Sequence, residues 1–80
     1  MRQEVRVPKW GLTIESAKII KWLKQEGDAV ALDEVLCEVE TEKSVAEIEA
    51  PFAGTLAEIV AGEGETRKVG ETVCTIDDAT

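Results

Sequence analysis

The sequence predicts an all-β domain, built as a sandwich or barrel of short strands. Apolar and polar residues alternate along several short runs, which is the pattern of strands with one buried face. Glycines stand between these runs, where turns are needed. The run from Glu15 to Lys24 could be read as a helix, but Ile19-Ile20 and an internal repeat favour a strand there.

The clearest alternation lies on both sides of the segment 41–44 and predicts a hairpin. With Glu42 and Lys43 as the central turn residues, apolar side chains face one another at three positions: Val39 with Ala46, Cys37 with Ile48 and Val35 with Ala50. A slip of one residue would move this apolar set to the other face, so the pattern selects one register. The register puts Lys43 on an exposed tip. It also sets Glu38 opposite Glu47, a mildly destabilising pair of like charges.

The chain resembles itself at an offset of 37 residues, at which Gly27 falls on Gly64 and Cys37 on Cys74. Two copies are too few for a solenoid, which needs at least three. Two halves that share one core around a pseudo-twofold axis explain the repeat better. The alignment predicts these strands: Glu4 to Val7, Lys18 to Leu23, Ala29-Val30, Val35 to Glu40, Val45 to Ala50, Thr55 to Val60, Arg67-Lys68 and Thr72 to Asp77.

One connection differs between the two halves. Pro8 corresponds to Pro51, but the second half reaches its next strand six residues sooner. The first half therefore carries an additional loop from Lys9 to Ser16, and the twofold relation places this loop beside Lys43.

The additional loop has two possible roles. Loops carry function more often than the scaffold does, so Trp10, Leu12 and Glu15 are predicted to contact a partner protein. Alternatively, Trp10, Leu12 and Ile14 form an apolar flap that only covers the end of the barrel.

Length and composition restrict the possible functions. Eighty residues make one small domain, expected to span residues 1–80 with a core from about 4 to 77. A chain of this size buries only about 60–65% of its unfolded surface, which leaves little room for a deep pocket. The absence of His removes the commonest general base and the commonest metal ligand. A net charge of −8 without a basic run argues against nucleic acid and anionic membranes as partners.

The chain shows no long apolar run and does not open with a signal peptide, so a cytosolic origin is expected. Its two cysteines, Cys37 and Cys74, lie far apart and form no Cys-x-x-Cys pair. Zinc binding and thioredoxin-type redox chemistry are therefore poorly supported. Both cysteines sit inside alternating apolar runs and are predicted to be small buried core residues.

The segment Glu40-Thr41-Glu42-Lys43-Ser44 is similar to the Glu-Thr-Asp-Lys-Ala motif of the lipoyl domains of 2-oxo-acid dehydrogenase complexes. Supporting segments resemble the same family: Trp22 to Asp28, Ala50 to Gly54 and Val69 to Val73. The resemblance extends from about Val5 to Asp77. The chain departs from the family pattern at Glu42, where Asp is usual, at Asp33, where Gly is frequent, and at Ser16-Ala17, which replace a common Gly.

The resemblance implies a flattened barrel, or barrel-sandwich hybrid, of two four-stranded antiparallel sheets with quasi-twofold symmetry. It implies lipoate held covalently by an amide on Lys43, with Glu40, Glu42 and Ser44 as flanking residues for recognition. Such a domain is a carrier and not an enzyme. It needs neither a catalytic residue nor a metal, because the cofactor carries the chemistry.

The resemblance also implies partners. These are a lipoyl ligase, a thiamine-diphosphate-dependent decarboxylating component, an acyltransferase core and a flavin-dependent dihydrolipoyl dehydrogenase. The domain is expected to be the N-terminal part of a larger dihydrolipoamide acyltransferase chain, in the bacterial cytoplasm or alternatively in the mitochondrial matrix. Val7 to Ile14 looks most similar to acyltransferase components for pyruvate or acetoin.

Other functions stay open at this point. A biotinyl carrier domain has the same fold, but that family flanks its lysine with methionine, whereas the neighbours here are Glu42 and Ser44. An unmodified structural domain, like the lipoyl-like domains of membrane-fusion adaptors, would usually lack the tip lysine. An exposed turn lysine can also simply keep a protein soluble.

Overall fold

The computed structural model describes residues 2–10 and 14–78, which form eight strands and no helix. None of these residues therefore belongs to a helix able to span a membrane. The strands are β1 (Arg2–Arg6), β2 (Ser16–Trp22), β3 (Ala29–Val30), β4 (Val35–Glu40), β5 (Val45–Glu49), β6 (Gly54–Ile59), β7 (Thr66–Lys68) and β8 (Thr72–Asp77). Every strand predicted from the sequence is present, with ends that differ by at most two residues.

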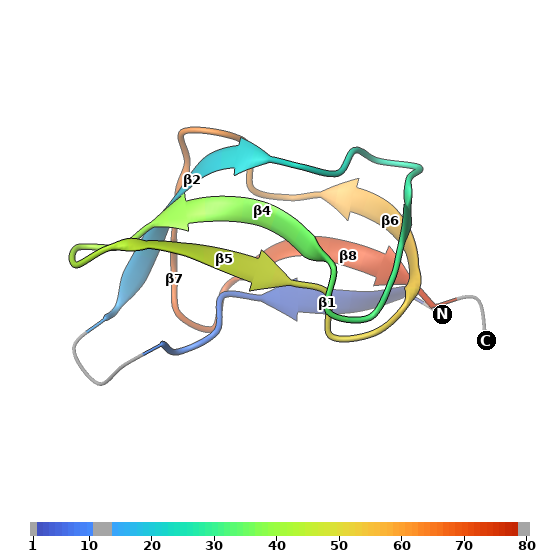
Figure 1. The fold of residues 1–80 in the computed structure, drawn as a ribbon, viewed down its shortest axis with the longest axis horizontal. Helices are drawn as coiled ribbons and strands as arrows, with labels where there is room; N and C mark the ends of the chain where they lie inside the picture. Colours follow the sequence, from blue (N-terminus) through green and yellow to red (C-terminus); the bar gives the residue numbers. More distant parts are fainter. Residues whose placement is uncertain (1, 11–13, 79–80) are drawn as a thin grey trace.

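The strands form two four-stranded antiparallel sheets that face each other (Figure 1). One sheet has the order β1-β8-β6-β3 and the other the order β5-β4-β2-β7. Exchanging β1 with β5, β2 with β6, β3 with β7 and β4 with β8 converts one order into the other. The predicted pseudo-twofold relation between the halves is thus confirmed, as is the all-β flattened sandwich, whose dimensions are 36 × 21 × 17 Å.

The twofold relation extends to irregularities of the backbone. The pairing of β4 with β5 skips Leu36, and the pairing of β8 with β1 skips Val73, the residue equivalent to Leu36. These bulges explain why two consecutive residues are buried in each strand, Leu36 with Cys37 and Val73 with Cys74. Regular alternation would turn one residue of each pair to the outside.

The bulge corrects one predicted contact of the hairpin. Val35 pairs with Glu49 and not with Ala50, because the skipped Leu36 shifts the register by one residue at that end. The two predicted pairs nearer the turn, Val39 with Ala46 and Cys37 with Ile48, are confirmed. Both lie between the bulge and the turn, where the pairing is regular.

Asp33 adopts a left-handed conformation with φ of 68°, and its equivalent in the second half is Gly70 with φ of 91°. Both residues donate their amide to equivalent acceptors, the carbonyls of Ala50 and Val7 respectively. The turn therefore requires positive φ in both halves, and Asp tolerates this conformation better than most residues other than Gly. Asp33 is a departure in sequence but not in backbone geometry.

One hydrophobic core fills the space between the sheets. Both cysteines are completely buried in it, as predicted, and both are free thiols. The other completely or nearly completely buried apolar residues are Val5, Val7, Ala17, Ile19, Val30, Leu36, Val39, Ile48, Ala50, Leu56, Ala61, Val73 and Ile76. Burial raises the pKa of both thiols to about 12, because a thiolate would lose its hydration there.

The raised thiol pKa predicts that the domain loses stability in alkali. In the folded state both thiols stay protonated, whereas in the unfolded chain they ionise near their ordinary pKa of about 8.5. The stabilisation is complete below that pH and is lost as pH rises toward 12. We expect the free energy of unfolding, measured in urea, to fall by roughly 1.6 kcal/mol for each thiol between pH 8.5 and pH 10.

The Cys37→Ala and Cys74→Ala variants provide the control. Each should be less stable by about 1 kcal/mol at neutral pH, where a small buried group is lost, and each should show a flatter pH dependence. The wild-type thiols should react with a thiol reagent slowly when folded and rapidly in denaturant. Rapid labelling without denaturant, or a native disulfide, would contradict this prediction.

Candidate functional site

The candidate site is the turn between β4 and β5, at the far end of the hairpin (Figure 1). Glu40 pairs with Val45, so Thr41 and Ser44 close the turn and Glu42 and Lys43 form its tip. Both tip residues are exposed, as the sequence predicts. The arrangement presents a primary amine on a long side chain, clear of the two sheets.

Hydrogen bonds from one threonine hold the backbone of this turn. The amide and the hydroxyl of Thr41 both donate to the carbonyl of Ser44, each at 2.8 Å. The same hydroxyl oxygen accepts hydrogen bonds from the amides of Lys43 and Ser44, at 3.3 and 3.1 Å. No role was predicted for Thr41 from the sequence. A hydroxyl residue just before a two-residue turn is a signal that could have identified it, because Ser and Thr bond to backbone groups two or three residues away.

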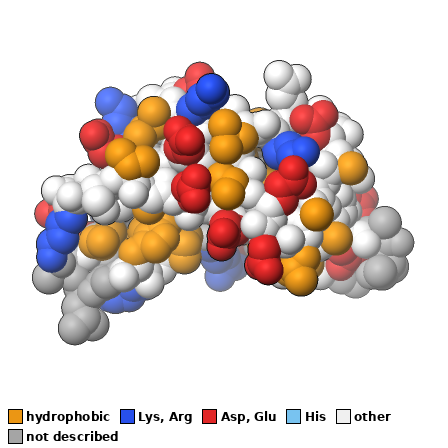
Figure 2. Space-filling view, in the orientation of Figure 1, with side chains coloured by type: hydrophobic (Ala, Val, Ile, Leu, Met, Phe, Trp, Pro, Cys, Tyr) orange, Lys and Arg blue, Asp and Glu red, His pale blue; other side chains and the backbone are white. Residues whose placement is uncertain are grey.

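The outer face of the hairpin is acidic. Glu38 faces Glu47 across β4 and β5, as predicted, and Glu40 lies next to the turn. On the other side of β4 the register places Lys21 opposite Glu38 and Lys18 opposite Glu40. Figure 2 shows the resulting pattern, with Asp and Glu side chains across the middle of this face and basic side chains over β2.

The additional loop ends beside the turn. Because Lys18 pairs with Glu40, Ser16, which stands two residues before Lys18, lies farther along β2 in the direction of the turn. Ser16 itself belongs to β2, where it pairs with Lys68 of β7, so the strand begins two residues earlier than predicted. The predicted position of the loop, at the lysine end of the domain, is therefore confirmed at its C-terminal side.

The predicted partner contacts of the loop have different surroundings. Trp10 is partly buried against the hydrophobic core, which supports a covering role for this side chain. Leu12 lies outside the described residues. Glu15 is exposed, and its carbonyl accepts a hydrogen bond from the amide of Val69 at 2.8 Å. Recognition of a partner by the loop remains a prediction.

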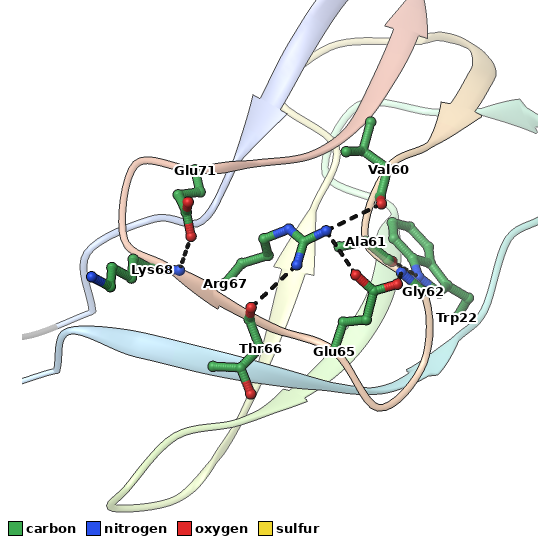
Figure 3. Close-up of polar contacts among 9 residues, drawn as sticks. All are labelled: Trp22, Val60, Ala61, Gly62, Glu65, Thr66, Arg67, Lys68 and Glu71. Atoms are coloured by element: carbon green, nitrogen blue, oxygen red, sulfur yellow. Dashed lines mark hydrogen bonds and ion pairs between the residues drawn. The ribbon is translucent and has the colours of Figure 1, made fainter.

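The second half of the domain supports β2 through polar contacts of the connection from β6 to β7 (Figure 3). Arg67 donates hydrogen bonds to the carbonyls of Val60 and Thr66 at 3.3 and 3.2 Å, and it pairs with Glu65 at 2.7 Å. The Gly62 amide and the Arg67 guanidinium hold the pKa of Glu65 below its usual range.

The same connection is tied to the end of β2. The indole of Trp22 donates to the carbonyl of Ala61 at 2.7 Å, and the amide of Gly64 donates to the carbonyl of Ile19, also at 2.7 Å. Neither Trp22 nor Arg67 was assigned such a role from the sequence. The indole of Trp22 bonds to a residue about forty positions away in the sequence, and Arg67 bonds to the Val60 carbonyl across the connection. No local sequence pattern indicates either contact.

Known proteins resemble this chain both in sequence and in fold. A model of the biotin- and lipoyl-attachment family, described as biotin-requiring enzyme, matches residues 3–76. A solved lipoyl domain, that of the 2-oxoglutarate dehydrogenase complex from Azotobacter vinelandii, superposes with a TM-score of 0.73 and 34% sequence identity. The match covers 92% of this chain and 94% of that domain.

The chain belongs to the lipoyl-domain family. The chain also matches parts of longer proteins. The dihydrolipoyllysine-residue succinyltransferase component of the 2-oxoglutarate dehydrogenase complex from Bartonella vinsonii subsp. berkhoffii is 48% identical over 69 residues, which are 86% of this chain. The mitochondrial dihydrolipoyllysine-residue acetyltransferase component 3 of the pyruvate dehydrogenase complex from Arabidopsis thaliana is 46% identical over 78 residues, 95% of this chain. The chain spans only 17% and 14% of the length of these two proteins.

The like-charge pair of this lipoyl domain generates a stability prediction. Glu47→Lys would place opposite charges at adjacent positions, and we expect the free energy of unfolding to rise by about 0.2–1 kcal/mol. The gain should shrink as salt is added, because the two side chains lie on the surface. Chemical denaturation at low and high salt measures both effects.

Glu49→Lys is the matched control for the like-charge pair. It lowers the negative charge equally, but Glu49 pairs with Val35 and has no carboxylate directly opposite. Equal gains from the two substitutions would show that net charge, and not the cross-strand pair, limits stability.

Proposed function

We propose that this lipoyl domain carries lipoic acid in amide linkage on Lys43. The observation that carries the proposal is the exposed amine at the tip of a turn held by hydrogen bonds. The turn lies at one end of the long axis of the domain, away from the chain termini. A lipoyl ligase must reach the amine with its own active site, and an exposed tip gives that access. The exposed side chain also fits the group, since a long unbranched acyl chain on an exposed amine can extend into solvent.

Attachment requires a simple reaction of the lysine side chain. The Lys43 amine, after loss of a proton, attacks the carboxyl carbon of lipoate that the ligase has activated as an acyl phosphate or adenylate. The new carbon–nitrogen bond forms as the bond to phosphate oxygen breaks, and the phosphate compound leaves. The positive charge of the side chain disappears in this step. When bound, the dithiolane supplies a disulfide that accepts two electrons together with an acyl group and is restored by oxidation of the dithiol.

The domain contributes position to this chemistry. It tethers the arm so that encounters with several active sites occur at high effective concentration. We propose that these sites are the thiamine-diphosphate-dependent decarboxylating component, the acyltransferase core and dihydrolipoyl dehydrogenase of a 2-oxo-acid dehydrogenase complex. The acidic outer face, with Glu40 and Glu42 beside the amine, is proposed as the surface that the ligase contacts.

The parent protein is proposed to be a dihydrolipoamide acyltransferase with this domain near its N-terminus. The relatives in which matching domains occur are several times longer than this chain. They include components of bacterial and of mitochondrial complexes, and their names divide between 2-oxoglutarate and pyruvate. We propose the bacterial cytoplasm as the location. Use of pyruvate or acetoin, suggested by Val7 to Ile14, stays a prediction.

The modification of Lys43 can be tested directly. Incubation with a lipoyl ligase, lipoate and ATP should add one lipoyl group per chain, seen in the intact mass, and peptide mapping should place it on Lys43. Lys43→Arg should accept none, although its fold should be unchanged because residue 43 is exposed. Loss of the amine charge should make the product migrate as a more acidic species.

Lys9 and Lys68 serve as internal controls for the modification, since both are also exposed. Modification at either of them in place of Lys43 would contradict the proposal. A biotin protein ligase offered biotin should leave the chain unmodified, and efficient biotinylation of Lys43 would favour the biotinyl alternative.

The additional loop is expected to affect recognition by the decarboxylating component but not lipoylation. Shortening 9–16 to the length of the connection after Pro51 should leave Lys43 lipoylatable, because the turn and its hydrogen bonds lie in another hairpin. Reductive acylation by the cognate decarboxylating component should fall by at least tenfold, which corresponds to about 1.4 kcal/mol of recognition. Steady-state acylation of the lipoylated variant measures this.

Glu15→Lys separates recognition from covering of the core in this experiment. Its side chain is exposed, whereas Trp10 contacts the core, so Glu15→Lys should reduce acylation with little loss of stability. If shortening lowers stability and lipoylation together while Glu15→Lys has no effect on acylation, the loop only covers the core.

A further inference from the structure

The lysine-bearing turn does not have the backbone conformation that is usual for a two-residue hairpin turn. Two-residue hairpin turns normally adopt types I′ or II′, whose positive φ angles match the twist of the strands. Among the described residues, Asp33 is the only one other than glycine with positive φ, so Glu42 and Lys43 both have negative φ. The negative φ angles suit a lysine at the tip. A left-handed conformation costs free energy for a residue with a long side chain, whereas Gly or Asn adopts it easily.

A turn of this kind splays the strands unless something else holds it. The Thr41 hydroxyl supplies three hydrogen bonds across it, one donated to the Ser44 carbonyl and two accepted from the amides of Lys43 and Ser44. Thr41 is only 7% exposed and is the single buried polar residue among those described. Its contacts reach the backbone of Lys43 and not the amine.

The twofold relation of the scaffold does not extend to the residue type at Thr41. The residue equivalent to Thr41 in the second half is Asp78, which follows β8 and accepts a hydrogen bond from the Gln3 side chain at 2.7 Å. Many other backbone hydrogen bonds of the two halves are equivalent, including those of Asp33 and Gly70. The scaffold is thus duplicated, whereas a hydroxyl side chain stands at this position in the first half and a carboxylate in the second.

We propose that Thr41 is a positioning residue for modification of Lys43: its hydroxyl fixes the turn so that the amine enters the ligase active site in a reactive orientation. This inference rests on the proposed function. The physical reason is that acyl transfer needs the nitrogen close to the carboxyl carbon and correctly directed, and a mobile turn would lose part of that advantage. The hydroxyl acts through the backbone, so it should matter to an enzyme but not to a small reagent.

The test compares Thr41→Val, which removes the hydroxyl and keeps the shape, with Thr41→Ser, which keeps the hydroxyl. Thr75→Val is the matched control, since the Thr75 hydroxyl is buried without a hydrogen-bond partner among the described residues. For each domain, kcat/KM for lipoylation by a lipoyl ligase is measured by intact mass. Acetylation of Lys43 by acetic anhydride, followed by peptide mapping, measures the accessibility of the amine.

We expect Thr41→Val to lower kcat/KM for lipoylation at least tenfold, while Thr41→Ser and Thr75→Val stay within about threefold of wild type. Acetylation of Lys43 should be the same in all four proteins. A folded Thr41→Val domain lipoylated at the wild-type rate would overturn the proposal, and so would an equal loss in acetylation and lipoylation. If the wild-type domain is not lipoylated on Lys43 at all, the proposed function fails, which is a separate result.

Amide hydrogen exchange decides the matter if Thr41→Val does not fold. In the wild-type domain the amides of Lys43 and Ser44 should exchange at least tenfold more slowly than in an unstructured peptide, because both donate to the Thr41 hydroxyl. In Thr41→Ser they should remain protected. Exchange of both wild-type amides at the unstructured rate would show that the hydroxyl does not hold the turn, and would overturn the proposal.

Discussion

The burial of one inner strand in each sheet, β4 and β8, is the constraint on which the rest of the structure depends. Each pairs with two neighbours, and each turns two consecutive residues into the core by means of a bulge. Leu36 with Cys37 and Val73 with Cys74 are completely buried as a result. Burial of apolar area on this scale is the main source of stability for so small a domain. Because each strand has one register that buries this set, its pairing with the neighbouring strands is also fixed in register.

The fixed register of β4 determines where the lysine stands. From the pairs Cys37 with Ile48 and Val39 with Ala46, the ladder continues regularly to Glu40 and ends at the turn. A slip by one residue would expose Cys37 and Val39 and would also move the tip away from Lys43. The core therefore supports function at a distance, because the same apolar alternation that stabilises the sandwich centres the turn on the amine.

Symmetry of the scaffold and asymmetry of the site coexist in this lipoyl domain. The bulges, the left-handed residues Asp33 and Gly70 and many backbone hydrogen bonds occur twice. Among the described residues, the tip lysine, the Thr41 hydroxyl contacts and the additional loop belong to the first half. All three of these features gather at one end of the molecule, so that one half of the repeat supplies the site and the other half completes its core. The hydrogen bond from the Trp22 indole to the Ala61 carbonyl joins the two halves at β2, the strand that begins where the loop ends.

The sequence by itself determined the strand order along the chain, the hairpin register near the turn, the exposed lysine and the burial of both cysteines. These features follow from the alternation of apolar and polar residues and from the spacing of turns. Both patterns extend over a few residues and can therefore be recognised in the sequence. The tertiary structure decided the bulge at Leu36, which breaks the expected contact of Val35 with Ala50, since the demand for two adjacent buried residues comes from the opposite sheet. It also decided the burial of Trp10 and the bonds of Trp22, because their partners are distant in the chain and meet only when the two sheets pack.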